Sequence, residues 1–408
     1  MSISVGIITE NPFHGDLGFS IRTRELSIGL ANARCQVHVF SPVDQESEPY
    51  PNVFLHNISG KSNRNYDNIR EFLRKWSKSK RYGRYFYLNS ALSFISNQSA
   101  KMVYKSAKKY DLDLLQGTQA TTSSVAIRVG KHLGIPVIGG MGGMLVEEAV
   151  QAEIFEQNSI FYNSCKRFVS SVIQNSAALI CASEPMKKYL IDSYGVEGKK
   201  ITVIPNGANI PEGERVKKSD GDYVILYAGI LDIWEKVDVL IKSMPFVISR
   251  FPNAKLLIVG DGRLKNELTE LVKNNNLDKS VSFLGLQPRK KTLEMMLEAD
   301  VAVLPSSVDL VRKVACPIKL FDYMAAGLPI VTMDVGWWSD LVKSKNAGIV
   351  TADDPESFAE GICKAITEGH TTNNLLGYNA RKVIAEEYNW KRISENLLQL
   401  YKSILDDN

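Results

Sequence analysis

Two charged side chains, Lys319 and Asp322, lie three residues apart in the mostly apolar stretch from Cys316 to Thr332. Pro317 suits the first turn of a helix, because its missing N–H would have no partner there anyway. The three-residue spacing places both charges on one face of that helix. The N-terminus of a helix favours phosphate, so the pattern indicates a site for a phosphorylated ligand beside a sheet edge.

The elements that would position this charge pair follow from the local sequence. Residues Lys319 to Ala326 are mostly helix formers, and Gly327 can adopt the left-handed conformation that ends a helix. Pro329 follows, and the apolar run that begins at Ile330 predicts a buried strand. The expected order is therefore a turn, a helix and a strand.

The segment PIKLFDYMAAGLPIV, which starts at Pro317, resembles the motif of retaining GT-B glycosyltransferases of family four (glycosyl transferases group 1). The resemblance is good over about residues 200–405 and weaker over residues 1–200. It implies an α/β protein of two Rossmann-like domains that face each other across a cleft, with a C-terminal helix crossing back to the first domain. It also implies that a sugar is transferred from a nucleotide sugar with retention of configuration.

The resemblance and the order of the expected elements divide the chain into four parts. Residues 1–208 are expected to form the acceptor-side domain and residues 209–221 a polar linker. Residues 222–385 would form the nucleotide-sugar-binding domain, and residues 386–408 the terminal helix, anchored by Trp390. A chain of 408 residues is long enough for two domains of ordinary size.

Most of the donor-binding residues that the resemblance implies lie in the second domain. Lys236 would contact the donor diphosphate, and Asp322 would hydrogen-bond the ribose or the sugar, so both are expected in the catalytic centre. Further donor contacts are expected at Gly18, Gly229, Gly260, Gly262, Ser307, Lys319 and Leu320. A lone loop lysine is most often a solvated charge, and a partly buried ion pair can simply fix a helix.

Several positions depart from the family pattern. The helix carboxylate is normally Glu, whereas this chain has Asp322, and relatives often carry polar ligands where this chain has Ile230, Val314 and Met141. These departures keep open an interpretation as a non-catalytic sugar- or nucleotide-binding scaffold subunit. An epimerase or phosphorylase of the same fold is a further alternative.

The first domain begins with a β-branched strand at residues 3–9, followed by a glycine loop that opens a helix of about fifteen residues. Open α/β sheets bind ligands at the carboxyl ends of their strands. The resemblance implies that this loop meets both the acceptor and the donor phosphate, so His14 and Gly15 are candidates for the acceptor side. A plain strand-to-helix turn is the alternative. Glu147 and Glu148 follow a second glycine-rich loop and are also candidates, although acids at a helix start are commonly just dipole partners.

Residues 61–110 combine aromatic side chains with thirteen lysines and arginines and only two acids. Such a composition suits a helix that lies on an anionic membrane, and it makes a lipid-linked or membrane-presented glycan the expected acceptor. The residues expected at the membrane surface are Lys75, Lys78, Lys80, Arg81 and Arg84. A solvated helical face is the simpler alternative, and no nucleic-acid-binding motif accompanies the segment.

Composition and the N-terminal sequence indicate where the protein is located and whether it needs a metal. The chain has no apolar run of about 18 residues, and its N-terminus lacks the basic start and cleavage site of a signal peptide. We therefore expect a cytoplasmic protein that is peripheral on the membrane. The five cysteines are dispersed, which indicates reduced thiols and no zinc site. We expect no metal and no cofactor, with a UDP- or GDP-linked sugar as substrate.

Overall fold

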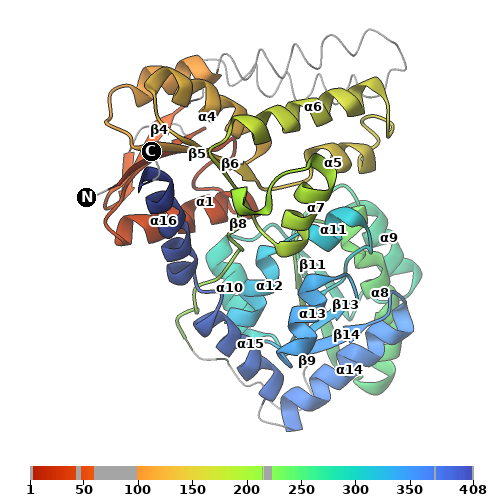
Figure 1. The fold of residues 1–408 in the computed structure, drawn as a ribbon. Coiled ribbons are helices and arrows are strands. Elements are labelled where there is room, and N and C mark those ends of the chain that lie inside the picture. Colours follow the sequence, from red (N-terminus) through yellow and green to blue (C-terminus); the bar gives the residue numbers. More distant parts are fainter. Residues whose placement is uncertain are drawn as a thin grey trace. The chain divides into compact units, whose positions relative to one another are not determined.

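The computed structural model describes residues 3–42, 47–58, 99–213, 215, 223–371 and 374–406. The chain divides into two compact units, which can be followed by colour in Figure 1. The first unit comprises Met1–Pro205 and Ile393–Asn408, and the second comprises Asn206–Arg392. The chain therefore leaves the first unit once and returns to it near the C-terminus.

A single mixed sheet forms the centre of the first unit. Its described strands are β1 (Ser4–Ile8), β2 (Gln36–Ser41), β3 (Ser47–Tyr50), β4 (Val53–Asn57), β5 (Leu114–Gly117), β6 (Val137–Met141), β7 (Ala178–Cys181) and β8 (Ile201–Val203). They lie in the order β3-β4-β2-β1-β5-β6-β7-β8, and only β3 runs antiparallel to its neighbour. The predicted β-branched strand forms β1, which is buried between β2 and β5.

Helices connect these strands and cover the sheet. They are α1 (Gly18–Asn32), α4 (Ala120–Leu133), α5 (Leu145–Gln151), α6 (Ile160–Asn175) and α7 (Glu184–Tyr194), and residues 99–107 are also helical. Helix α1 has the predicted length of fifteen residues. Its Leu26 and Leu30 are buried, as expected for the apolar face of a helix that packs on a sheet.

The second unit contains a fully parallel sheet. Its strands are β9 (Tyr223–Ala228), β10 (Ala254–Val259), β11 (Val281–Gly285), β12 (Val301–Leu304), β13 (Ile330–Met333) and β14 (Gly348–Thr351). They lie in the order β11-β10-β9-β12-β13-β14. Strands that alternate with helices in a parallel sheet confirm the prediction of Rossmann-like α/β units.

The helices of the second unit surround a large apolar core. They are α8 (Val237–Arg250), α9 (Lys265–Asn274), α10 (Arg289–Glu298), α11 (Leu310–Val314), α12 (Ile318–Ala325), α13 (Trp337–Ser344), α14 (Pro355–Thr371) and α15 (Leu375–Glu386). Tyr227, Phe321 and Tyr323 are completely buried in this core. Trp338 joins them at 1% exposure, and Trp337 donates its indole N–H to the Ala315 carbonyl at 2.7 Å.

The motif around the two charges has the predicted local structure. Pro317 precedes α12, Gly327 adopts a left-handed φ of 71° after the helix, and β13 follows. A Cβ at Gly327 would be strained, which explains the glycine at this position.

The terminal helix α16 (Trp390–Asp406) begins among residues of the second unit and continues as part of the first. Trp390 is 2% exposed. Further along α16, the buried Tyr401 hydroxyl donates to the Gln116 side-chain oxygen in β5 at 2.7 Å. The Tyr401 hydrogen bond joins α16 to the first sheet and confirms the predicted return of the last helix.

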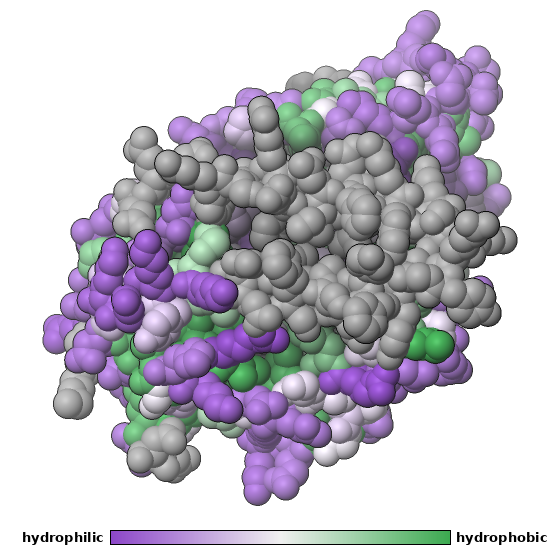
Figure 2. Space-filling model, turned by 90° about the horizontal axis from the view of Figure 1, so that it is seen from above, coloured by the Kyte–Doolittle hydropathy of each residue, from purple (hydrophilic) through white to green (hydrophobic). Residues whose placement is uncertain are grey.

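The coloured residues on the face in Figure 2 are largely hydrophilic, with smaller hydrophobic areas between them. Among the helices of the described residues, none is long and apolar enough to cross a membrane. The five residues that sequence analysis expects at the membrane surface, between Lys75 and Arg84, lie outside the described residues.

Candidate active site

Three loops lie next to one another at the carboxyl edge of the second sheet. They follow β9, β10 and β12, and β9 pairs with both of the other strands. Ligands of open parallel sheets bind at this edge. The structure therefore brings Gly229, Gly260, Gly262 and Ser307, four of the predicted donor contacts, onto neighbouring loops.

The loops after β9 and β10 pack closely against each other. Gly260 has a φ of 139°, and a Cβ at this position would collide with the carbonyl oxygen of Gly229. The Leu231 amide donates to the Asp261 carbonyl at 3.0 Å, and a Cβ at Gly262 would collide with Leu231. Close backbone packing explains Gly260 and Gly262, and their predicted contact with a donor stays a prediction.

Lys236 lies at the start of α8 with a left-handed φ of 49°. Its side chain is half-buried. The first N–H groups of a helix have no partner within the helix, so a cation at this position combines two features that favour phosphate. The contact between Lys236 and the donor diphosphate, which the resemblance implies, stays a prediction.

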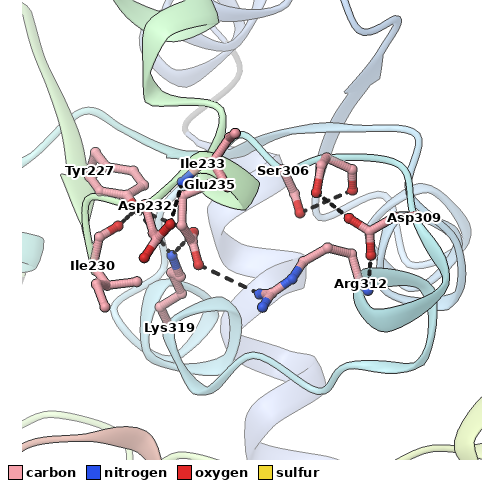
Figure 3. A network of polar contacts seen from close by, with 10 residues as sticks. Tyr227, Ile230, Asp232, Ile233, Glu235, Ser306, Asp309, Arg312 and Lys319 are labelled. Carbon is pink, nitrogen blue, oxygen red and sulfur yellow. Dashed lines mark hydrogen bonds and ion pairs between the residues drawn. The ribbon is translucent and has the colours of Figure 1, made fainter. Parts of the chain in front are cut away.

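Glu235, the residue before Lys236, is the centre of a buried polar cluster (Figure 3). Its carboxylate pairs with the Lys319 ammonium, and its other oxygen lies 3.6 Å from Nη1 of Arg312. The Tyr227 hydroxyl lies 3.2 Å from Glu235 and donates to the Ile230 carbonyl at 2.7 Å. Side chains from three elements, β9, α11 and α12, therefore converge on one carboxylate.

Burial is the largest cause of the pKa shifts of Lys319 and Tyr227 in this cluster. It lowers the pKa of Lys319, while the Glu235 carboxylate acts in the opposite direction and Arg312 adds to the lowering. Burial and the Glu235 charge raise the pKa of Tyr227 well above its ordinary value. The tyrosine is therefore neutral at physiological pH.

Aromatic and polar contacts support Arg312. The guanidinium groups of Arg263 and Arg312 lie 5.3 Å and 5.6 Å from the centre of the Trp234 ring. The Asp309 carboxylate accepts from the backbone N–H of Arg312 at 3.0 Å and from the Ser307 hydroxyl at 2.5 Å. The site thus holds Arg312 through its backbone and its side chain.

Asp322 has a different partner from Lys319. Both of its oxygens accept hydrogen bonds from the Arg289 guanidinium, at 2.8 Å and 2.9 Å. The Asp322 side chain is 6% exposed and that of Arg289 is 21% exposed. The two charges of α12 therefore belong to separate ion pairs. Leu320 lies between them in sequence, and its side chain is fully buried. Any contact of Leu320 with a donor, as predicted, would therefore have to be made by its backbone.

The loop after β1 carries the predicted acceptor-side residues His14 and Gly15. His14 is exposed, and Gly15 donates its N–H to the Pro12 carbonyl at 3.1 Å. Arg24 of α1 donates to the carbonyls of Phe13 and Gly15 at 3.2 Å and 3.1 Å, which fixes this loop. Gly18, a predicted donor contact, is the first residue of α1.

The glycine-rich loop after β6 leads into α5 and its two acids. Glu148 accepts from the Met144 amide at 2.9 Å, so it stabilises the start of the helix. Glu147 lines a small cavity together with Met141, Tyr189 and Tyr194. Burial, and after it Glu147, raise the pKa of Tyr189.

Sequence reasoning missed four residues that complete the second unit's site. They are Tyr227, Glu235, Arg289 and Arg312. Glu235 directly precedes the predicted Lys236, and Arg312 lies two residues before the discussed Val314. The closeness of Glu235 and Arg312 in sequence to positions already under discussion could have identified them as site residues.

The chain matches two family models of glycosyltransferases. Residues 211–383 match the family model described as Glycosyl transferases group 1, and residues 18–211 match Glycosyltransferase Family 4. Together the two matches cover most of both units. These matches support a GT-B glycosyltransferase.

Individual relatives agree with this glycosyltransferase assignment. An uncharacterized glycosyltransferase from Methanocaldococcus jannaschii is 26% identical over 283 residues, which are 66% of this chain and 67% of the relative. UDP-Gal:alpha-D-GlcNAc-diphosphoundecaprenol alpha-1,3-galactosyltransferase from Escherichia coli is 24% identical over 316 residues, 73% and 77% of the two chains. Glycosyltransferase activity with a nucleotide-sugar donor is supported.

A solved structure agrees on the fold. Sucrose-phosphate synthase from Thermosynechococcus elongatus superimposes with a TM-score of 0.76 at 19% identity, and the comparison covers 100% of both chains. At this level of identity the similarity shows the GT-B fold alone.

Proposed function

We propose that this glycosyltransferase transfers a hexose from a UDP- or GDP-linked donor to a lipid-linked or membrane-presented glycan, with retention of anomeric configuration. The main support is the half-buried pair of cations around Glu235 at the carboxyl edge of the sheet that the Glycosyl transferases group 1 model covers. A nucleotide sugar carries a diphosphate, which such cations bind. The Escherichia coli relative, whose name specifies a UDP sugar and a diphosphoundecaprenol-linked acceptor, supports the choice of both substrates.

Catalysis on this proposal consists mainly of charge stabilisation. Negative charge develops on the diphosphate as it leaves the sugar, and fixed cations and helix N-termini stabilise that charge. Lys236 at the N-terminus of α8 would carry out this role without a divalent metal. Asp322 would contact the donor ribose or sugar, although Arg289 already binds both of its oxygens in this structure.

The acceptor would approach the loops of the first unit. His14, Gly15 and Glu147 are the candidate contacts, because they follow β1 and β6 at the carboxyl edge of that sheet. An exposed imidazole and a carboxylate next to buried tyrosines can each hydrogen-bond a sugar hydroxyl. His14→Ala and Glu147→Gln should weaken use of the acceptor and leave nucleotide binding unchanged.

A transfer assay tests the proposed function directly. The wild type is incubated with radiolabelled UDP- and GDP-sugars and a diphosphoundecaprenol-linked sugar, and label is measured in the lipid phase. We expect transfer from one nucleotide series, undiminished by EDTA, and a product whose NMR coupling constants show retention. Lys236→Ala should reduce transfer at least tenfold, whereas Lys242→Ala, a change of an exposed lysine in α8, should not. Nucleotide binding without any transfer would favour the scaffold interpretation.

We also propose that the enzyme binds the cytoplasmic face of a membrane through the basic aromatic segment. The test is sedimentation with vesicles that contain phosphatidylserine, at low and at physiological salt. Neutralising Lys75, Lys78, Lys80, Arg81 and Arg84 should abolish binding. The control neutralises five exposed lysines of the second unit, Lys242, Lys273, Lys290, Lys291 and Lys382. Equal sedimentation of the two variants would contradict the proposal.

A further inference from the structure

The Glu235 cluster carries more positive than negative charge. Lys319 and Arg312 share the single carboxylate of Glu235, whose side chain is 7% exposed. The two cations are themselves only 17% and 20% exposed. Burial of unpaired charge is costly, so a surplus cation in such a place indicates that an anion completes the cluster.

Of the two cations, Arg312 has hydrogen-bond donors that are not used by Glu235. Its distance of 3.6 Å from Glu235 is longer than a hydrogen bond, and its buried Nε has no hydrogen-bond partner in the part of the chain that the structure describes. A guanidinium group can donate two parallel hydrogen bonds to one phosphate. The group is therefore available for an anionic ligand.

The surroundings hold Arg312 ready for such a ligand. Its guanidinium lies over the Trp234 ring, and the Trp234 carbonyl accepts from the Ser307 amide at 2.8 Å. This last bond ties the loop after β12 to the loop after β9. A cation that is positioned before the ligand arrives loses less conformational freedom on binding.

We propose that Arg312 and Lys319 form a clamp for the diphosphate of the nucleotide-sugar donor, with Glu235 as the residue that positions both. The inference rests on the proposed function. It adds Arg312 as a ligand and assigns Lys319, already an expected donor contact, to the diphosphate. The loop after β9 has an exposed Ile230 where a cation of the family would stand, and Arg312 supplies the missing charge from the neighbouring loop. Lys319 lies against Gly229 in that same loop.

Calorimetric titration with UDP, UMP and inorganic pyrophosphate tests the clamp. Arg312→Met should weaken UDP and pyrophosphate binding at least tenfold and should reduce the preference for UDP over UMP. Lys313→Met is the matched control, because Lys313 is the exposed next residue of α11, and it should bind all three ligands as the wild type does. Arg312→Lys, which keeps the charge, should recover part of the affinity.

The pH dependence of UDP binding tests Lys319 separately. The groups that face its ammonium are Glu235, Tyr227 and Arg312. Burial lowers the pKa of Lys319, and it raises the pKa of Tyr227 well above its ordinary value, so Tyr227 stays neutral. UDP affinity of the wild type should therefore fall on the alkaline side as Lys319 loses its proton. Lys319→Arg should keep its affinity there, because arginine stays protonated.

The outcomes separate this inference from the proposed function. If Arg312→Met is folded and binds UDP as the wild type does, the clamp is wrong even when sugar transfer is observed. If the wild type binds UDP through Arg312 but transfers no sugar, the clamp stands and the proposed function fails. A wild type that binds neither UDP, GDP nor pyrophosphate overturns the clamp.

Discussion

Helix α12 carries two charges in contrasting environments, the buried Asp322 and the half-buried Lys319. Asp322 and Arg289 form a matched pair with two hydrogen bonds, whereas one carboxylate serves both Lys319 and Arg312. The matched pair is complete without a ligand, and the unmatched cluster has a positive charge left over. The difference shows that a ratio of charges can distinguish a structural ion pair from a candidate anion site, although both are largely buried.

The largest effect on stability is expected when the carboxylate of the unmatched cluster is removed. Glu235→Gln keeps the shape of the side chain but leaves two largely buried cations, 17% and 20% exposed, without a counter-ion. The free energy of unfolding should fall by about 3–5 kcal/mol, measured by urea denaturation. Glu270→Gln, which breaks an exposed pair with Lys273, should cost less than about 1 kcal/mol. Equal losses in the two variants would contradict the contrast.

Removing one charge of the matched pair should lower the free energy of unfolding more than removing both charges. Asp322→Asn leaves Arg289 without its carboxylate and should destabilise the protein by about 3 kcal/mol. The double change Asp322→Leu and Arg289→Leu removes both charges, so most of that loss should be recovered. Unfolding curves of the three proteins give the comparison, and a double variant less stable than Asp322→Asn would refute it.

The first unit extends the contrast to a buried pair that is kept neutral. His38 Nδ1 lies 3.0 Å from His56 Nε2, and both rings contact Tyr110. Burial lowers the pKa of each imidazole to about 4, with further lowering from His56 at His38 and from Lys109 at His56. The unfolded chain therefore takes up protons first as the pH falls below 6.5.

The free energy of unfolding should consequently decrease between pH 6.5 and pH 4. The loss should be about 2 kcal/mol for each imidazole by pH 5. His38→Phe combined with His56→Leu should flatten this dependence, whereas His132→Asn, at an exposed site, should leave it unchanged. Urea midpoints measured across this range would contradict the account if the wild type and the double variant had the same slope.

The smallest effect on stability is expected when one cation of the unmatched cluster is removed. Lys319→Met leaves Glu235 paired with Arg312, and Arg312→Met leaves it paired with Lys319. In each variant the cluster becomes a matched pair and no buried charge is left without a partner, so the free energy of unfolding should change by less than about 1 kcal/mol. A loss of 3 kcal/mol or more in thermal or urea unfolding would show that both cations are structural.

The sequence predicted the fold well, because the fold follows from local patterns, whereas the predicted donor and acceptor contacts stay predictions. Buried runs such as residues 3–9 gave strands, and Gly327 ended α12 as its backbone freedom suggests. It predicted the partners of the charges poorly. Lys319 and Glu235 are 84 residues apart, and Arg289 and Asp322 are 33 apart. Helical spacing shows which side chains share a face but says nothing about the loop that packs against that face.

Binding of inorganic pyrophosphate tests the central claim most directly, because it has a diphosphate but no ribose, base or sugar. Calorimetry would compare the wild type, Lys319→Met and the double change Asp322→Leu and Arg289→Leu. The account predicts that the wild type and the double variant bind pyrophosphate, and that Lys319→Met binds at least tenfold more weakly while remaining as stable as the wild type. Unchanged binding by a folded Lys319→Met, or loss of binding only in the double variant, would contradict it.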